Sequence, residues 1–213
     1  MTEKLREELI ATAGEMNRFG INQGTSGNLS LRCGDGLLIT PSGLPYDRLE
    51  PADIVFLQID SGDVPAAGLR KPSSEWRIHR DVYRARPEAL AILHAHPVHC
   101  ATLACLHRPL PAFHYMVAVA GGRDIRCAPY ATFGTQALSD HVLAALAGRR
   151  ACLMANHGLL CLGPDLRSAL ALAVEIEALA KTYLACLAAG EPVILDAAEM
   201  DRVLEKFKSY GKG

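Results

Sequence analysis

The chain has 213 residues, half of them apolar, and a formal net charge of −1, which fits one globular domain spanning residues 1–213. This composition offers no basic surface for nucleic acid or a membrane, no run of roughly 18 apolar residues that could span a bilayer, and no signal peptide. Seven cysteines, scattered and without a C-x-x-C pair, favour reduced thiols and a cytoplasmic protein.

The N-terminal part is predicted to be one helix followed by three short strands. Apolar residues at helical spacing predict a helix over residues 3–18, closed by Gly20. Residues 28–32 and 37–40 are alternating or apolar runs, and the glycine-containing turn between them predicts a β-hairpin. A third strand is expected over residues 54–59.

The middle of the chain is predicted to run from a helix through a strand into a second helix. Ser73 or Ser74 can cap a helix that continues to the break at Pro87. The apolar residues 91–93 read as a buried strand, and Pro97 suits the first turn of the next helix.

The C-terminal part adds helices and strands in alternation. Helices are predicted over residues 135–147, 166–188 and 197–208, and strands over residues 151–155 and 159–162. Helices that flank short strands joined by hairpins predict one layered α/β domain with a mixed or mainly antiparallel sheet.

Three histidines form the most informative pattern. His94 and His96 continue the apolar strand, and side chains at i and i+2 of a strand point to the same face. His157 follows a second apolar strand and precedes a glycine. Two imidazoles on one face and a third from another element match the three-ligand shell of a catalytic zinc, which leaves a fourth position for water, substrate or a carboxylate. The histidines within predicted helices are instead expected to be packed or solvated: His79, His99, His107 and His141.

Three polar segments could bind an anion. Residues 22–28 are rich in glycine, hydroxyls and amides, residues 40–43 form a second turn of this kind, and Ser73 and Ser74 lie at a helix N-terminus. Each segment alone also suits an ordinary turn or cap. Together, and beside three histidines, they predict a phosphorylated substrate.

Glu75 directly follows the paired serines, in the first turn of the predicted helix. A carboxylate is common there because it interacts favourably with the helix dipole. Beside a metal, the same carboxylate could act as acid/base on a carbon next to a polarised carbonyl. The sequence leaves both interpretations open.

Several segments, long enough to be specific, resemble the class II aldolase/adducin family. They are Asn-Gln-Gly-Thr-Ser-Gly-Asn (22–28), Ile-Thr-Pro-Ser-Gly-Leu-Pro-Tyr (39–46), Pro-Ser-Ser-Glu-Trp-Arg-Ile-His (72–79), His-Ala-His-Pro-Val-His-Cys (94–100) and Ala-Pro-Tyr-Ala-Thr-Phe-Gly-Thr (128–135). The resemblance runs nearly end to end. It implies a three-layer αβα domain with a central, mainly antiparallel sheet and a homotetramer with active sites at subunit interfaces. It also implies one Zn²⁺ per subunit, with Mn²⁺ or another divalent metal as substitutes.

The resemblance also assigns roles to residues of this chain. It makes His94, His96 and His157 the metal ligands, and Glu75 the acid/base that can itself ligate the metal when substrate is absent. The phosphate would be held by Thr25, Asn28, Ser42, Gly43, Ser73 and Ser74.

Two tyrosines complete the implied site. Tyr115 would act as a proton donor or acceptor in a neighbouring subunit's site, and Tyr210 in the tail would close over the substrate. Asn156 stands where the family pattern leads us to expect a histidine, a change that could affect the orientation of His157.

The implied reaction is cleavage of a ketose 1-phosphate of the L-fuculose 1-phosphate type to dihydroxyacetone phosphate and an aldehyde such as lactaldehyde. One alternative keeps the reaction and uses 5-deoxyribulose or 5-methylthioribulose 1-phosphate. Another is a methylthioribulose-1-phosphate dehydratase or a ribulose-5-phosphate 4-epimerase. A third is a non-catalytic module like the adducin heads, in which the ligand histidines are typically lost. Expected partners are a small sugar phosphate and further copies of the chain, not nucleic acid or a membrane.

Overall fold

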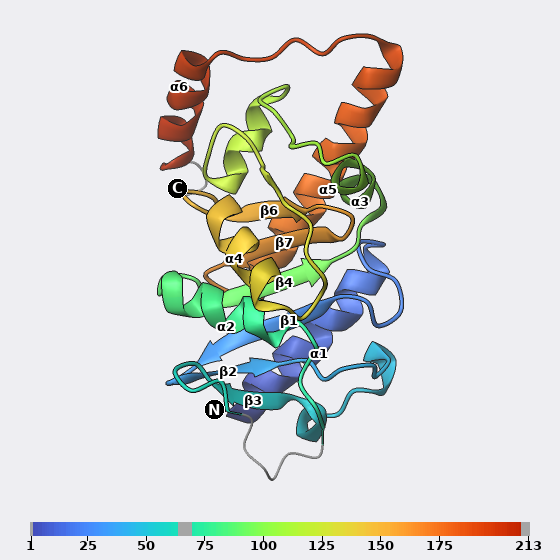
Figure 1. Cartoon of the computed structure of the whole chain (residues 1–213), viewed down its shortest axis with the longest axis vertical. Coiled ribbons are helices and arrows are strands. Elements are labelled where there is room, and N and C mark those ends of the chain that lie inside the picture. Colours follow the sequence, from blue (N-terminus) through green and yellow to red (C-terminus); the bar gives the residue numbers. More distant parts are fainter. Residues whose placement is uncertain (1, 64–69, 210–213) are drawn as a thin grey trace.

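A seven-stranded sheet organises the chain (Figure 1). The computed structural model describes residues 2–63 and 70–209. Its strands are β1 (Asn28–Cys33), β2 (Gly36–Ile39), β3 (Val55–Gln58), β4 (Ala91–Ala95), β5 (Cys127–Ala128), β6 (Ala151–Met154) and β7 (Gly158–Gly163). They are ordered β3-β2-β1-β4-β7-β6-β5, and only β5 and β6 pair in parallel. The predicted mixed, mainly antiparallel sheet is therefore confirmed.

Helices cover both faces of this sheet. They are α1 (Thr2–Arg18), α2 (Trp76–Ala85), α3 (Val98–Cys105), α4 (Gln136–Ala145), α5 (Leu166–Ala189) and α6 (Ala197–Phe207), with the 3-10 helices η1 (Tyr46–Arg48), η2 (Pro51–Asp53) and η3 (Tyr115–Ala120). Helices α2 and α4 pack on one face, and α1, α3 and α5 pack on the other, so the three-layer αβα prediction is confirmed (Figure 1). Within the described ranges, no helix is both long enough and apolar enough to cross a membrane.

The alternation of side chains along β4 divides the core between the two faces. Leu93 packs in the cluster beneath α1 and α5, whereas Ile92 packs with Ile78 and Val82 of α2. Because side chains two apart on a strand share a face, His94 points to the α2 side of the sheet. This places the first predicted metal ligand opposite the start of α2.

The predicted start of α2 was wrong. The helix begins at Trp76, so Glu75 rather than Ser73 or Ser74 occupies the N-cap position, and no side chain caps the helix. A turn precedes the helix, in which the Trp76 N–H donates to the Ser73 carbonyl at 3.1 Å. Glu75 therefore lies just before the first helical turn and not within it. Pro97 is likewise the N-cap of α3 and not its first residue.

The sequence analysis missed four elements, of which η1 and η2 are single turns of three residues each. Strand β5, which pairs with β6 at the sheet edge, has only two residues. A strand of this length is too short to produce a periodic sequence pattern. The 3-10 helix η3 lies in a stretch that is apolar without helical or strand periodicity. Strand β5 forms by pairing with β6, and η3 packs against α5 and α6.

Candidate active site

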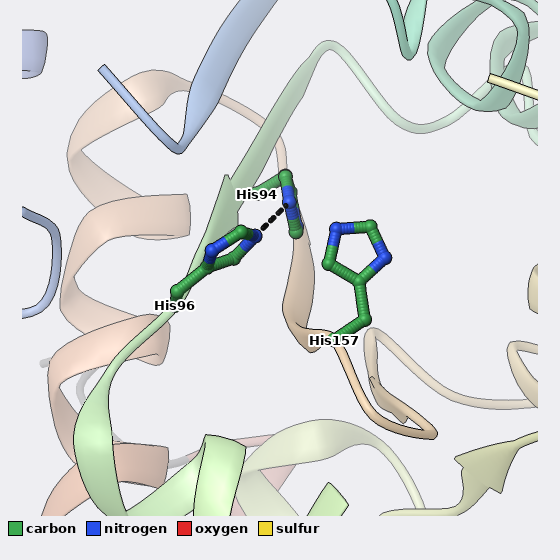
Figure 2. A group of neighbouring side chains, drawn as sticks. All are labelled: His94, His96 and His157. Atoms are coloured by element: carbon green, nitrogen blue, oxygen red, sulfur yellow. Dashed lines mark hydrogen bonds between the residues drawn. The ribbon is translucent and has the colours of Figure 1, made fainter. Parts of the chain in front are cut away.

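Three imidazoles meet where β4 ends and where β6 turns into β7 (Figure 2). His94 lies within β4, His96 follows it, and His157 lies in the β6–β7 turn. The ring centroids are 4.8–4.9 Å apart, and one nitrogen from each ring lies within 4.8 Å of the others. The structure thus brings together all three histidines that the sequence singled out.

Close approach of backbone segments makes this convergence possible. A Cβ at position 158 would lie 2.5 Å from the Ala95 carbonyl oxygen and 2.7 Å from Cδ2 of His96. Only glycine therefore lets β7 begin directly beside the end of β4. This explains the Gly158 that follows the third histidine in the sequence.

The residue before His157 supports the same turn. Asn156 has a left-handed backbone with φ of 52°, which asparagine tolerates better than most residues. Its side-chain oxygen accepts a hydrogen bond from Nε2 of His107 at 2.5 Å, and its N–H donates to the Ala104 carbonyl at 3.1 Å. Asn156 thus ties the His157 turn to the end of α3.

His94 and Glu75 form a buried pair. Nδ1 of His94 donates to the Leu159 carbonyl at 3.0 Å, so Nε2 faces Oε2 of Glu75 at 3.1 Å and Nε2 of His96 at 2.9 Å. Burial opposes charge on both partners, but their mutual attraction outweighs it. The pKa of His94 is therefore raised above its ordinary value, and the pKa of Glu75 is held well below its own.

The other two imidazoles are neutral near pH 7. Burial, reinforced by the charge of His94, lowers the pKa of His96 and of His157 to about 4. Metal binding requires unprotonated nitrogen, so these side chains are in the protonation state that a ligand needs.

The site fits a divalent metal. Oε1 of Glu75 is buried, lies 3.3 Å from Nε2 of His157, and has no hydrogen-bond partner among the described residues. A buried acceptor of this kind requires a partner, and a bound ion would satisfy it. Three imidazoles and one carboxylate form a donor set typical of transition metals, and a metal would take the place of the His94 proton.

A cavity of about 290 Å³ opens beside the histidines. Its lining includes the polar residues Ser26, Ser74, Glu75 and Asn156 and the aromatic residues Tyr130 and Phe133. A space of this size, lined by both polar groups and aromatic rings, suits a small polar substrate with an apolar end.

The predicted phosphate-binding segments lie near one another. The N–H of Ser42 donates to the Lys71 carbonyl and that of Ser73 to the Thr40 carbonyl, both at 3.1 Å, so the turn over residues 40–43 lies against the start of α2. Ser74 is exposed to the cavity, while the buried Ser73 hydroxyl accepts the Glu75 N–H at 3.3 Å.

The other residues that were predicted to bind the phosphate differ in their exposure and contacts. Gly43 is exposed and has φ of 72°, a left-handed backbone that favours glycine. Thr25 is exposed in the loop before β1 and is not among the residues that line the cavity. Asn28 is buried, with Nδ2 donating to Oε2 of Glu75 at 3.0 Å.

Sequence analysis missed a buried hydrogen-bond network behind Glu75. It consists of Glu75, Asn28, His79, Ser30 and Tyr83, each at most 5% exposed. The signal was present in the spacing: three of these residues recur every four positions along α2, and two lie two apart on β1. The network remains hidden until α2 is known to pack on β1.

The structure does not bring Tyr115 to the histidines within one chain. Tyr115 begins η3, is 51% exposed, and stacks on His114 with ring centroids 4.9 Å apart. It lines a separate cavity of about 740 Å³ between η3 and α6. Tyr210 lies outside the described residues.

Comparisons with known proteins agree with this geometry. Residues 7–184 match the family model described as Class II Aldolase and Adducin N-terminal domain. The chain is 56% identical over 207 residues to the 5-methylthioribulose-1-phosphate/5-deoxyribulose-1-phosphate aldolase of Rhodospirillum rubrum, covering 97% of this chain and 92% of that one. It is 51% identical over 209 residues to the L-fuculose phosphate aldolase of Escherichia coli K12, covering 98% and 96%. A solved structure of an L-fuculose 1-phosphate aldolase matches with a TM-score of 0.92 at 42% identity, covering 96% of each chain.

The chain therefore belongs to the class II aldolase and adducin family, which confirms the resemblance seen in its sequence. It is a class II aldolase, an enzyme of the lyase class. The relatives carry two different substrate names, so similarity by itself does not select the substrate.

Proposed function

We propose that this chain is a zinc-dependent aldolase that cleaves a ketose 1-phosphate into dihydroxyacetone phosphate and an aldehyde. The observation that carries the proposal is the convergence of His94, His96 and His157 with the Glu75 carboxylate beside a cavity. The names of the similar proteins, which all refer to sugar-phosphate aldolases, support it.

The three histidines would hold the metal, with Glu75 as a further ligand when substrate is absent. Zinc matches the nitrogen-rich donor set best, and Mn²⁺ or another divalent ion could replace it. A bound metal would stabilise the negative charge that develops on the substrate oxygens as the carbon–carbon bond breaks.

Glu75 would hold and move the proton at carbon 3 of the substrate. Its low pKa keeps the carboxylate ionised at neutral pH, so in the condensation direction it can accept the proton from this carbon. In the cleavage direction the carboxylate would first take up a proton from solvent and would then deliver it to carbon 3 after the bond between carbons 3 and 4 has broken. Oε2 is held by Asn28, which leaves Oε1 as the oxygen available for this transfer.

The phosphate would lie at the start of α2. The exposed hydroxyl of Ser74 lines the cavity, and the turn that carries Ser42 and Gly43 lies alongside. Ser73 still has its hydroxyl hydrogen to donate, and the Asn28 amide nitrogen carries a second hydrogen besides the one bound to Glu75. Thr25 would approach from the loop before β1.

We also propose that the enzyme is a homotetramer in which Tyr115 contributes to a neighbour's site and takes the proton of the carbon-4 hydroxyl. The exposure of Tyr115 outside the cavity of its own chain supports this. Three expectations stay predictions. They are the closure of Tyr210 over the substrate, a single domain over residues 1–213, and a cytoplasmic location.

Two aldehydes are candidates. L-fuculose 1-phosphate would yield lactaldehyde, and 5-deoxyribulose or 5-methylthioribulose 1-phosphate would yield an aldehyde without the lactaldehyde hydroxyl. The rings of Tyr130 and Phe133 at the cavity favour the second, because they suit its more apolar end, and the name of the Rhodospirillum rubrum enzyme agrees with this choice.

A panel of ketose phosphates tests the proposal. Dihydroxyacetone phosphate and aldehyde, measured together, should form in equal amounts, and the substrate with the highest kcat/KM identifies the aldehyde. Loss of water or inversion at carbon 4 without cleavage would replace the proposal with a dehydratase or an epimerase. No turnover of any sugar phosphate by the metal-loaded protein would favour a non-catalytic module.

A further inference from the structure

One face of α2 and one face of β1 interlock behind Glu75. Glu75, His79 and Tyr83 follow one another at intervals of four, and Asn28 and Ser30 are two apart on the strand, so each set shares a face. The hydrogen bonds pass alternately between helix and strand. They run from Glu75 to Asn28 (3.0 Å), His79 (2.5 Å), Ser30 (2.6 Å) and Tyr83 (2.9 Å).

The carboxylate at one end fixes the direction of every hydrogen bond. An ionised Glu75 only accepts, so the Asn28 NH₂ group must face it and the Asn28 oxygen must face His79. His79 therefore carries its proton on Nε2, and its Nδ1 accepts from the Ser30 hydroxyl. The Ser30 hydrogen is then used, so Tyr83 is the donor in its contact with Ser30 at 2.9 Å, which is closer than its other acceptor, the Leu90 carbonyl at 3.4 Å. Burial lowers the pKa of His79 to about 3, consistent with a neutral ring that has a single N–H.

We propose that His79 is a positioning residue for the acid/base: its Nε2–H fixes the Asn28 amide, which in turn holds Oε2 of Glu75 and keeps Oε1 directed at the metal site. The inference rests on the role of Glu75 in the proposed function. It also gives Asn28 a task beyond the phosphate, because both ends of its amide are engaged by Glu75 and His79.

The physical reason is that an amide with one partner is free to rotate. Without the His79 N–H, the Asn28 oxygen has no donor in the network and the amide can turn away from Glu75. The carboxylate then loses a charge-assisted hydrogen bond and its fixed orientation. Proton transfer requires the carboxylate within hydrogen-bond reach of its target, so turnover falls while the serine hydroxyls of the phosphate site and the three metal ligands are unchanged.

Two substitutions at one position separate positioning from packing. His79→Leu removes the donor at similar volume, and His79→Gln keeps an N–H at about the position of Nε2. We expect His79→Leu to lower kcat about 10- to 100-fold with unchanged metal content. KM and inhibition by inorganic phosphate should change less than kcat, because the serine hydroxyls of the phosphate site keep their positions and only the Asn28 amide moves. His79→Gln should recover most of the lost kcat. Val82→Ala, which opens a cavity on the same helix without removing a hydrogen-bonding group of the network, is the matched control and should keep the wild-type kcat.

Crystal structures of the two His79 variants give a readout that does not depend on activity. The distance from Asn28 Nδ2 to Glu75 Oε2 should exceed hydrogen-bond length in His79→Leu and stay near 3.0 Å in His79→Gln. An unbroken bond in His79→Leu, an unchanged kcat, or an equal loss in Val82→Ala would overturn the proposal.

Failure of the proposed function and failure of a variant to fold can each be distinguished from failure of the positioning role. If wild-type protein cleaves no ketose 1-phosphate, the proposed function fails, and the two crystal structures still decide whether His79 positions Glu75. If His79→Leu does not fold, Ser30→Ala removes the hydroxyl that fixes the His79 tautomer. That variant should lower kcat severalfold with a smaller change in KM, and a wild-type kcat would overturn the proposal.

Discussion

The proposed mechanism draws on two regions that are built in opposite ways. Around the histidines, Glu75 is buried, held by Asn28 and paired with His94. Around η3, Tyr115 is half exposed and its ring stacks only on the neighbouring His114 side chain among the ring contacts of the described residues. In the first region, the reactive groups are held in place by strands and helices that are far apart in the sequence. In the second region, the tyrosine side chain is not held in this way.

This difference shows which half of the site one chain can complete alone. The metal ligands and the carboxylate come from β4, the β6–β7 turn and the start of α2, all packed in one core. The tyrosine lines another cavity, between η3 and α6. The predictions below test whether the first region works as a unit and whether the second needs a further chain.

Metal removal should have the largest effect. Chelation should abolish nearly all cleavage, and one equivalent of zinc per chain should restore it, because the carboxylate and imidazoles alone leave the developing charge unstabilised. His157→Ala should bind less than one equivalent, measured by metal analysis. His141→Ala, which removes a histidine outside the cluster, is the control and should retain a full equivalent. Full activity in the metal-free protein would contradict the proposed centre.

Glu75→Gln should have the next largest effect. The glutamine oxygen can still accept from Asn28, so metal content and phosphate inhibition should persist, while kcat falls by ~10²–10⁴-fold for loss of the acid/base. Glu15→Gln, which removes a surface ion pair with Arg18, is the matched control and should match wild type. A variant with near-normal kcat would exclude Glu75 from the proton transfer.

Mixed oligomers test the second region. Tyr115→Phe and Glu75→Gln subunits should each be inactive, and their hybrids should regain up to about a quarter of wild-type activity, since random pairing restores one intact site in four. Each variant carried alone through the same mixing procedure is the control. Hybrids that form but stay as inactive as their parents would place the whole site within one chain.

Local sequence patterns were enough to predict the histidine cluster. His94 and His96 are two apart at the end of an apolar strand, so strand geometry directs them to one face, and His157 follows another apolar strand next to a glycine. The layered fold was predictable for the same reason, because helical and strand periodicity mark most of its elements.

The contacts of Glu75 could not be predicted in this way. Glu75 meets Asn28 across 47 residues of sequence, and His79 meets the same asparagine across 51. These contacts depend on how α2 lies on β1, which no local pattern encodes. The resemblance to a family suggested a phosphate role for Asn28 and gave no sign of its two buried hydrogen bonds.

The buried region should also be sensitive to acid. The pKa of His79 is about 3 in the folded protein and ordinarily 6.5, so below pH 6.5 the unfolded chain binds a proton that the folded chain does not. Stability therefore falls as pH drops, and His79 accounts for about 2 kcal/mol of the loss between pH 7 and 5.

Denaturant unfolding of metal-free protein measures this contribution. The free energy of unfolding of His79→Gln should fall by about 2 kcal/mol less than that of wild type over the same interval. Val82→Ala removes buried methyl groups but no titrating group, so it should show a constant offset from wild type. Parallel curves for wild type and His79→Gln would mean that His79 titrates equally in both states.

The smallest effect is expected at the serines that precede α2, where a fixed and a free hydroxyl lie side by side. Ser73 accepts the Glu75 N–H and is buried, whereas Ser74 is exposed to the cavity. Ser74→Ala should therefore raise KM about tenfold at constant kcat, the cost of one hydrogen bond to a charged group, and weaken inhibition by inorganic phosphate. Ser61→Ala, in an exposed turn beyond β3, is the control and should leave both constants unchanged. If Ser74→Ala lowers kcat instead, this hydroxyl belongs with the fixed groups around Glu75 and not with the phosphate. If the wild-type enzyme turned over the dephosphorylated sugar equally well, the proposed phosphate site would be contradicted.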